Sequence, residues 1–349
     1  MLYIEQMKSG RENLLTVCIS TYNRADKLSK NLENWFNLNN DKNNAVKLFV
    51  FDNCSTDNTN TICSAYLKKK NFTYIRNKKN VGILGNLEIC AERANGKYVW
   101  IIGDDDLVKP NAIELVIAII KKHKDIPLIY VNYSYIEKIC TKSENPKNIT
   151  KEVYVSSSQA DGLYKIKHLC TNNENFFTGI YTCIFQNKHA KKAFISYKET
   201  PPFSDLKTSA PSSDYVLNNL MKSYGYWVSM PQIAIDLDVS WKAFIPIWVL
   251  KIVPEMHDLA ISKGASKKEV SFWREYHVKF IYQNLKRLLA EGDTENSKVF
   301  DLSKLINQHK KSESFKRVKK KIFLNYIINW LLKKPCARVK PWKVFSYDT

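Results

Sequence analysis

The sequence of 349 residues lacks the features that mark several classes of protein. It contains eight cysteines, but no two of them have the CxxC spacing and no histidine pair lies beside them at zinc-finger spacing, which argues against a zinc site. A disulfide-stapled scaffold would be shorter and denser in cysteine. Most of the cysteines lie in apolar stretches, so we expect reduced thiols that pack as small hydrophobic side chains.

Long hydrophobic runs are also missing. The amino-terminal residues have no apolar signal core, so we expect no export by that route. Residues 115–120 form an apolar run of six, and residues 322–332 form one of eleven that is broken by two asparagines and a tyrosine. A membrane-spanning helix needs about 20 apolar residues. We therefore expect a soluble or peripheral protein.

The charge of the chain is strongly basic. Lys and Arg total 54 against 34 Asp and Glu, a formal net charge of +20, although the apolar (44%) and charged (25%) fractions are ordinary for a globular protein. The length suggests about two domains. Residues 316–349 carry ten of the Lys and Arg residues and one acid. This excess predicts an anionic partner, which could be nucleic acid, a membrane surface or a phosphorylated substrate.

Hydrophobic patterning predicts alternating strands and helices over the first 136 residues. Strands are expected at residues 14–20, 46–51, 72–75, 98–102 and 127–136. Helices are expected at 26–38, 57–69, 84–95 and 110–122, with Asp26 as a cap and Pro110 in a first turn. This repetition indicates an α/β fold with a mostly parallel sheet flanked by helices. Further along, we expect a helix at 213–224, a strand at 232–237 and mainly helices from 242 onward.

Polar clusters come directly after three of the predicted strands, at residues 22–24, 52–57 and 104–106. Ligands of open parallel sheets bind at the carboxyl ends of the strands, so the clusters are predicted to share one site. In the third cluster, Asp104, Asp105 and Asp106 raise one another's pKa values unless a cation is present. Carboxylate oxygens suit Mg²⁺ or Mn²⁺, with phosphate oxygens completing the shell. The alternative is a solvated acidic turn that caps the helix near Pro110.

Four segments occur in the order and spacing of a known family. They are residues 17–24 (VCISTYNR), 50–57 (VFDNCSTD), 80–86 (NVGILGN) and 94–106 (ANGKYVWIIGDDD). Together they resemble the nucleotide-sugar half of family 2 glycosyltransferases with the GT-A fold, of the bacterial surface-polysaccharide type. The resemblance is strong over residues 14–135 and looser to about 241. It implies a nucleotide-sugar-binding half (1–136), an acceptor-binding half (137–241) and a helical C-terminal extension with a basic tail (242–349).

The resemblance implies roles for residues of the first half. The nucleotide-sugar-binding candidates are Ser20, Tyr22, Arg24, Asp52, Asn80, Gly82, Asn86 and Asp104. Among them, Asp52 is implied as the contact to the base because it ends the second strand. Asp105 and Asp106 are implied as ligands of Mn²⁺ or Mg²⁺ on the donor diphosphate, with Asp105 the principal one. Many members read Asp-x-Asp-Asp, whereas this chain has Gly103 at the first of these positions.

The second half should supply the catalytic base. An inverting transferase needs a carboxylate that takes the proton of the acceptor hydroxyl. The resemblance places this residue at the start of a helix, which implies Asp214, with Asp205 as the runner-up. The alternative for Asp214 is a helix cap. Residues 177–179 resemble a segment that lines the acceptor side, and Trp241 is either a sugar-stacking residue or part of the core.

The leading hypothesis is a metal-dependent, inverting glycosyltransferase. It would move a sugar from a nucleotide-sugar donor to a hydroxyl of a surface glycan or a lipid-linked oligosaccharide. The basic tail around residues 322–332 suits an anionic bilayer surface, which predicts a cytoplasmic enzyme that is peripheral on the inner face of the cell membrane. The alternative for the tail is a solvated helix that packs on the catalytic domain.

Three other functions compete with this hypothesis. A nucleic-acid-binding protein would suit the charge, but the charge is concentrated in the tail and no nucleic-acid module is recognisable, so no nucleic acid is expected as a partner. A nucleotidyltransferase would need a glycine-rich phosphate loop, and residues 21–24 contain no glycine. A non-catalytic nucleotide-sugar-binding relative is disfavoured by the intact carboxylate run.

Overall fold

The structure is a computed structural model. It describes residues 13–140, 148–155, 157–195, 200–236 and 244–291, together with 315–318, 320, 321 and 324. The chain folds as two compact units. Unit 1 comprises Met1–Lys198 and Asn219–Asp238, and unit 2 comprises Glu199–Asn218 and Val239–Thr349. The predicted boundaries at 136 and 241 stay predictions, and Trp241 and most of the basic tail lie outside the described residues.

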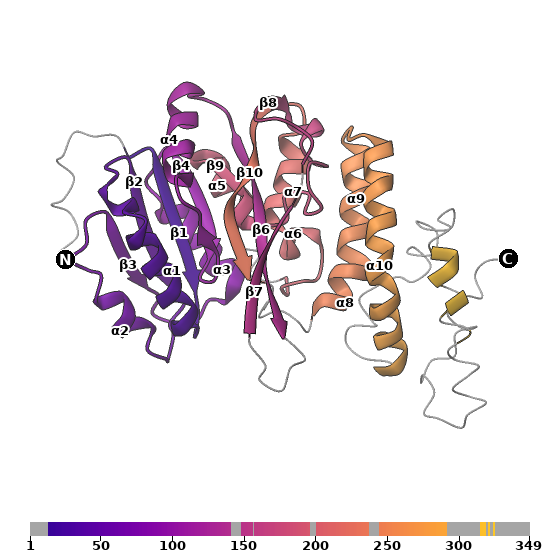
Figure 1. Ribbon diagram of the computed structural model, residues 1–349, viewed down its shortest axis with the longest axis horizontal. Helices are drawn as coiled ribbons and strands as arrows, with labels where there is room; N and C mark the ends of the chain where they lie inside the picture. Colours follow the sequence, from indigo (N-terminus) through magenta and orange to yellow (C-terminus); the bar gives the residue numbers. More distant parts are fainter. Residues whose placement is uncertain are drawn as a thin grey trace. The chain divides into compact units, whose positions relative to one another are not determined.

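Unit 1 begins with the four strand–helix repeats that the sequence predicts (Figure 1). Its first strands are β1 (Leu15–Thr21), β2 (Val46–Asp52), β3 (Phe72–Arg76) and β4 (Tyr98–Gly103). They pair in parallel in the order β3-β2-β1-β4. The helices between and after them are α1 (Ala25–Asn37), α2 (Thr59–Ser64), α3 (Gly82–Arg93) and α4 (Ala112–Lys122), with a short 3₁₀ helix at Asn40–Lys42. Because the strands run in one direction, their carboxyl ends meet at one edge of the sheet.

The sheet continues beyond β4 with a mixture of strand directions. The further strands are β5 (Leu107–Val108), β6 (Leu128–Cys140), β7 (Asn148–Tyr154), β8 (Gly162–Lys165), β9 (Cys183–Gln186) and β10 (Tyr224–Asp236). β9 lies antiparallel between β4 and β6, whereas β6 and β10 are parallel. The pairing of β10 with β6 shifts register around Pro231, because a proline has no N–H to donate to the ladder. The remaining helices of this part are 3₁₀ turns at Ile166–His168 and Ile180–Thr182 and helix α5 (Asn187–Ala193).

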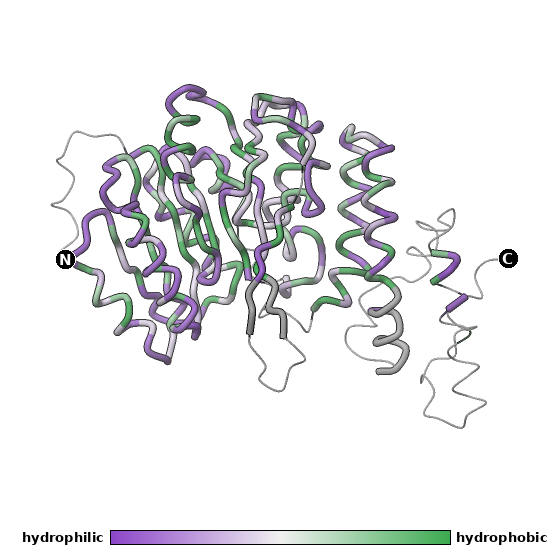
Figure 2. The backbone as a smooth tube through the Cα atoms, in the orientation of Figure 1, coloured by the Kyte–Doolittle hydropathy of each residue, from purple (hydrophilic) through white to green (hydrophobic). Residues whose placement is uncertain are grey.

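The core of unit 1 lies along the central strands. Leu15, Val17 and Ile19 on β1 are fully buried, and so is the large side chain of Trp100 on β4. Figure 2 shows the corresponding hydrophobic stretches along the strands. Strands buried on both faces are expected to be continuously apolar rather than alternating. This is why the runs that end in polar clusters were recognisable in the sequence.

Several element ends differ from the prediction. α1 starts after Arg24, and Asp26 lies inside its first turn without capping it. The cap comes instead from Asp57, whose Oδ2 accepts a hydrogen bond from the backbone N–H of Ala25 at 2.9 Å. Pro110 lies before α4, because Asn111 is the residue that precedes the first helical position. α2 ends at Ser64, not at residue 69.

Unit 2 is helical, as predicted for the chain beyond 242. It contains α6 (Leu206–Ser209), most of α7 (Pro211–Asn219), α8 (Ile245–Ile247), a π-helical turn (Trp248–Ile252), α9 (Val253–Ser262) and α10 (Lys267–Glu291). The π turn lies where Pro254 removes an N–H donor from the helical ladder. The predicted helix at 213–224 ends earlier, because residues from 224 onward pair in β10. Among the described residues, no helix is long and apolar enough to cross a membrane.

Candidate functional site

The carboxyl edge of β1–β4 gathers the polar clusters of unit 1. Thr21 pairs in register with Asp52, which in turn pairs with Arg76, and Ser20 lies opposite Gly103. In Figure 1, the arrow of β1 points toward this edge. The predicted nucleotide-sugar and metal residues lie at the ends of these strands, in the loops that follow them, or at the start of α3. The structure therefore brings this group together at one edge, as the strand pattern predicted.

The three carboxylates form a tight turn that α1 stabilises. The backbone N–H of Gly103 donates to Oδ2 of Asp106 at 2.6 Å. The buried amide of Asn31 on α1 donates to the carbonyl oxygens of Gly103 (3.1 Å) and Asp106 (2.8 Å). The turn is thus tied to the helix that follows β1. These contacts do not support the alternative prediction of an acidic turn that caps α4, because Asp106 accepts its hydrogen bond from within its own turn.

Arg24 is the cation that faces the carboxylates. Its Nη1 lies 2.9 Å from Oδ1 of Asp104, and its Nη2 donates to Asp105. The hydroxyl of Thr21 donates to Oδ2 of Asp104 at 2.8 Å. Although burial alone would lower the pKa of Arg24, the neighbouring carboxylates raise it above its ordinary value. The sequence analysis placed Arg24 among the residues that bind the nucleotide-sugar. In the structure, its guanidinium binds Asp104 and Asp105 of the carboxylate turn.

One arginine does not compensate the buried negative charge. Asp104 is 2% exposed, and burial raises its pKa to about 7 in spite of Arg24 and Thr21. Burial, together with the charge of Asp105, also raises the pKa of Asp106 well above its ordinary value. Asp105 is the more accessible of the three at 14% exposed. A further cation at this edge would stabilise the ionised forms.

Gly103 precedes the three acids, and a side chain at this position would lie close to two of them. A Cβ at this position would lie 2.9 Å from Oδ1 of Asp105 and 3.0 Å from Oδ2 of Asp106. Real Cβ atoms do not approach oxygens this closely without a shift of the neighbours. The two carboxylates thus converge on the space that the absent side chain leaves. A side chain at this position would require the ends of these two carboxylates to shift.

The buried carboxyl of Asp104 predicts a pH-dependent stability in the absence of metal. Its pKa is about 7 in the folded chain against 3.8 in an unfolded one, so the folded state binds the proton more tightly. Between these two pH values the free energy of unfolding should fall as the pH rises. We expect thermal unfolding in a chelator at pH 5, 6, 7 and 8 to show the stability of Asp104→Asn increasing relative to wild type. A difference between the two proteins that does not change with pH would contradict the assignment.

Asp52 lies beneath the edge rather than on it. Its side chain is fully buried, and its Oδ1 accepts from the backbone N–H of Ser55 at 2.8 Å. Its Oδ2 accepts from the hydroxyl of Tyr74 at 2.7 Å and lies 3.3 Å from Nε of Arg76. The pKa of Tyr74 is raised, by burial first and then by this bond to Asp52. The predicted contact of Asp52 with a base stays a prediction, and both carboxylate oxygens already have partners within unit 1.

A chain of side-chain amides joins three more of the predicted residues. Asn53 donates to Asn80 at 2.8 Å, and Asn77 donates to Asn53 (3.2 Å) and to Asn86 (2.9 Å). Asn86 then donates to the hydroxyl of Ser20 at 2.7 Å. The sequence analysis missed Asn53 and Asn77, which connect the others. Each directly follows a strand of the structure, β2 or β3, and lies two residues beyond the predicted strand end.

The surface of this edge is apolar as well as charged. Tyr22 after β1 is 42% exposed, and Val81 and Ile83 at the start of α3 are also exposed. Gly82 between them has a φ of +76°, a conformation that glycine adopts without strain. Its N–H donates to Oδ1 of Asn80 at 2.8 Å. Exposed apolar side chains beside charged groups suit a ligand with a flat ring and a phosphate part.

Tyr133 and Tyr181, from the second half of the sheet, lie near the carboxylate turn together with Glu174. The sequence analysis did not identify Glu174 as a site residue. Tyr133 donates to Oε1 of Glu174 at 3.4 Å, and its ring meets that of Tyr181 edge to face at 5.4 Å. The pKa of Tyr181 is raised well above its ordinary value, first by burial and then by Asp106, Glu174 and Asp105. No local spacing pointed to Glu174, because the contact joins distant parts of the chain.

The predicted acceptor segment lies in the same loop. Phe176 and Phe177 are fully buried with positive φ values of 47° and 66°, which is costly for residues with a Cβ. The hydroxyl oxygen of Tyr130 lies 2.5 Å from Oδ1 of Asn173 and 2.7 Å from Oδ1 of Asn175, within hydrogen-bond distance of both. These contacts fix the backbone of residues 173–177, the stretch that contains Glu174. The predicted role of residues 177–179 on the acceptor side stays a prediction.

The two candidate bases belong to unit 2. Asp205 caps α6, since its Oδ1 accepts from the backbone N–H of Thr208 at 2.8 Å. Asp214 lies in the first turn of α7 and accepts a hydrogen bond from Asn218 at 3.0 Å. Burial raises the pKa of Asp214, Lys207 opposes this and Asp205 adds to it. The runner-up therefore has the capping role that the sequence left open for Asp214.

The residues present suit a divalent cation in their chemistry. Asp105 can offer its Oδ1 to a cation, because its ion pair with Arg24 uses Oδ2. Oδ1 of Asp104 also binds Arg24. Within the part of the chain that the structure describes, no three or more His, Cys, Asp or Glu residues form a group that could hold a metal ion. A cation at this turn would therefore take one or two protein carboxylates and complete its shell with oxygens of a bound ligand.

Comparison with known proteins gives a family and a fold. The family model described as glycosyl transferase family 2 matches residues 16–189. The abequosyltransferase RfbV of Salmonella typhimurium is 32% identical over 117 residues, which is 33% of this chain and 35% of that protein. The glycosyltransferase GlyG of Streptococcus pneumoniae is 31% identical over 91 residues, 25% of this chain and 29% of that protein. The matched part thus spans about a third of the length of these relatives.

Among solved structures, the chain is similar to TarS 1–349 of S. aureus in complex with UDP-GlcNAc. The TM-score is 0.50 at 14% identity, covering 84% of this chain and 79% of that one. At this identity the similarity concerns the fold alone. It confirms the predicted α/β architecture of GT-A type, with a central sheet flanked by helices.

Proposed function

From its membership of glycosyl transferase family 2, carried by residues 16–189, we propose that this chain transfers a sugar from a nucleotide-sugar donor to a hydroxyl of a glycan or lipid-linked acceptor. The observation that carries the proposal is the carboxyl edge of β1–β4, where Arg24, Asp104 and Asp105 lie beside an exposed apolar surface. A nucleoside diphosphate combines a flat base with a charged diphosphate. The edge offers a group of matching chemistry for each part.

On the donor side, the residues of the edge have distinct roles. Arg24 and Thr21 orient Asp104, and the Asn53–Asn77 amide chain positions Asn80, Asn86 and Ser20. Asp105, with support from Asp104 and Asp106, would bind Mn²⁺ or Mg²⁺. When bound, such a cation stabilises the negative charge that develops on a leaving diphosphate. Tyr22 supplies an exposed aromatic face for the nucleoside.

On the acceptor side, we assign the base to Asp214 and an inverting course to the reaction. Asp214 takes the proton from the acceptor hydroxyl as that oxygen attacks the sugar. Its pKa is raised, mainly by burial, which strengthens the carboxylate as a base. Asp205 is bound to the backbone of α6 and is the poorer candidate.

The proposed surroundings of the reaction follow from the charge. The ten Lys and Arg residues of 316–349 favour an anionic membrane surface, at the cytoplasmic face where lipid-linked acceptors are available. No nucleic-acid partner is proposed. The acceptor is taken to be a surface glycan or its lipid-linked precursor.

A thermal-shift screen tests the proposal directly. We expect one nucleoside diphosphate out of the uridine, cytidine, guanosine and adenosine series to raise the unfolding temperature with Mn²⁺ and not with a chelator. A ligand at 100 times its Kd stabilises the folded state by about 2.7 kcal/mol. If no nucleotide gave a metal-dependent shift, the proposed donor site would be wrong. Mn²⁺ alone is the control for non-specific stabilisation by the metal.

A further inference from the structure

A cavity of unit 1 lies at the opposite edge of the sheet from the carboxylates. It has a volume of about 870 Å³ and is lined by residues that precede β1, β2 and β4 and by the end of α4. β1 has seven residues between the two edges, which corresponds to about 20 Å. The cavity is therefore separate from the proposed donor site.

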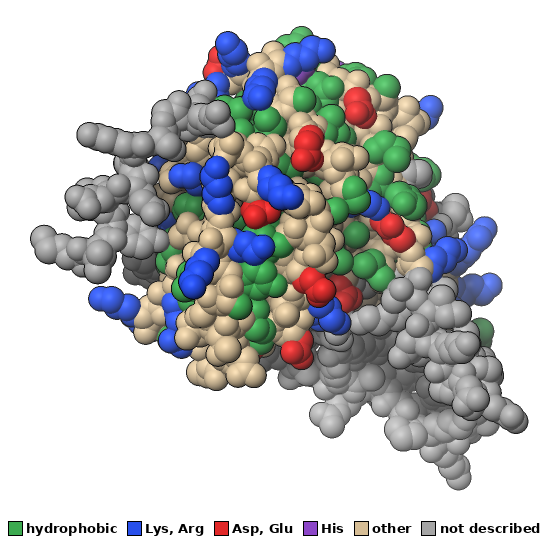
Figure 3. All heavy atoms as spheres, turned by 60° about the vertical axis from the view of Figure 1, so that its left-hand side comes forward, with side chains coloured by type: hydrophobic (Ala, Val, Ile, Leu, Met, Phe, Trp, Pro, Cys, Tyr) green, Lys and Arg blue, Asp and Glu red, His purple; other side chains and the backbone are tan. Residues whose placement is uncertain are grey.

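The charged residues that line this cavity have one sign. Four lysines take part, Lys42, Lys97, Lys121 and Lys124, and no acid is among the described residues of the lining. Figure 3 shows a face of the chain on which Lys and Arg side chains have Asp and Glu side chains among them. Lysines that gather without acids between them repel one another, so an anion in the cavity would be stabilised.

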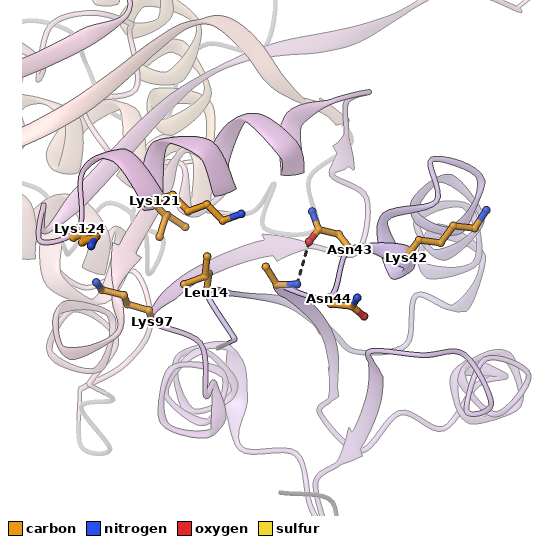
Figure 4. A pocket seen from close by; sticks show the side chains of 9 residues that line it. Leu14, Lys42, Asn43, Asn44, Lys97, Lys121 and Lys124 are labelled. Carbon is orange, nitrogen blue, oxygen red and sulfur yellow. Dashed lines mark hydrogen bonds between the residues drawn. The ribbon is translucent and has the colours of Figure 1, made fainter. Parts of the chain in front are cut away.

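Three of the four lysines have side chains that lie at the cavity itself. Figure 4 shows Lys97 and Lys124 on one side of the cavity and Lys121 reaching across it toward Asn43, while Lys42 points away. Lys97 is half-buried, and its ion pair with Asp125 is long at 3.9 Å. Asp125 is 87% exposed, so water and salt screen this pair. The described lining of the cavity thus carries a net positive charge.

Helix electrostatics explains only part of the cluster. Lys121 lies in the last turn of α4, where a positive charge interacts favourably with the helix dipole. Lys124 lies beyond the helix end, and Lys97 comes from the segment before β4. A role in stabilising α4 does not account for these two lysines. Three ammonium groups from two segments around one cavity match the point-charge mode in which lysine binds phosphate.

We propose that this cavity, defined by Lys97, Lys121 and Lys124, binds a phosphate-bearing anion. Its volume lies within the range of about 300–1,000 Å³ that is usual for small-ligand sites. The phosphate could belong to a soluble polyphosphate compound or to a lipid headgroup. The proposal does not depend on the donor site, because it rests on a different edge and different residues.

The test uses the full-length chain and inorganic tripolyphosphate in a chelator at 150 mM salt. Calorimetry should show binding to wild type and an affinity at least 10-fold lower for the triple variant Lys97→Gln, Lys121→Gln, Lys124→Gln. Absence of binding to wild type would overturn the proposal. Nucleotide-induced stabilisation with Mn²⁺ should be the same in both proteins, which separates this result from the fate of the donor site.

A matched control separates the cavity from net charge. The variant Lys30→Gln, Lys165→Gln, Lys192→Gln removes the same number of charges from exposed positions on α1, β8 and α5. We expect its affinity for tripolyphosphate to stay within about two-fold of wild type. An equal loss in both triple variants would mean that overall charge, not the cavity, binds the anion, and would overturn the proposal.

Vesicles distinguish the two sources of phosphate. If the site binds lipid headgroups, the cavity variant should lose cosedimentation with phosphatidylglycerol vesicles, and tripolyphosphate should compete with wild type. If it binds a soluble ligand, cosedimentation of wild type and the cavity variant should be equal although tripolyphosphate binding differs. Each result supports a phosphate site and identifies its source.

Discussion

Replacing Asp214 with asparagine should lower turnover by about 10²–10⁴-fold, the range that general-base catalysis supplies. Asparagine preserves the size of the side chain and the oxygen that accepts from Asn218, but it cannot take a proton. Nucleotide binding should be unchanged, because the base acts on the acceptor. The measurement is release of nucleoside diphosphate from the donor found by the screen. Turnover equal to wild type would remove Asp214 from the mechanism.

Asp205→Asn is the matched control for this variant. Asparagine is a good helix cap, so the contact with Thr208 at the start of α6 should survive and stability should hardly change. We expect turnover within a few-fold of wild type. A large loss in Asp205→Asn and none in Asp214→Asn would transfer the base to the runner-up. The pH profile adds a second readout, since the acidic limb of wild type should lie above the ordinary aspartate pKa of 3.8.

Replacing Asp105 with asparagine should remove the Mn²⁺-dependent part of nucleotide binding, with a loss of about 10²-fold or more. Asp105 is the most accessible acid of the turn, and one of its oxygens faces the space beside Gly103. Asparagine retains an oxygen that accepts from Arg24 but lacks the negative charge that a divalent cation needs. The fold should persist, since Asp104 still binds Arg24 and Thr21.

The measurement is titration of the nucleotide with and without Mn²⁺. Asp125→Asn, a largely exposed acid at the other edge of unit 1, is the control and should bind like wild type. Metal-dependent binding that survives in Asp105→Asn would show that another group is the principal ligand. In that case Asp106 and Asp104 would be the next residues to replace.

The strands and the site edge were accessible from local sequence. β1, β2 and β4 are mostly apolar runs because they are buried on both faces, and such runs are readable without knowledge of the fold. Each ends where polar residues start, so the sequence placed Ser20, Asp52 and the acids 104–106 at strand ends. Parallel pairing then follows from the helices between the strands.

Contacts between distant residues were not accessible in this way. Arg24 and Asp105 are 81 residues apart, and their ion pair depends on the register of β1 beside β4. The cap that Asp57 provides for α1 depends on β1 lying beside β2. Glu174 and Tyr133 are 41 residues apart, and their hydrogen bond depends on the tertiary arrangement. None of these contacts has a signature in local periodicity.

The sequence by itself determined the alternation of strands and helices, the polar strand ends and the run of three acids. Apolar periodicity and strand-end chemistry are properties of neighbouring residues, so they can be read one segment at a time. Only the tertiary structure decided which groups compensate these acids and which lysines share a cavity at the far edge. Those outcomes depend on register and chain direction, which join residues that no local pattern connects.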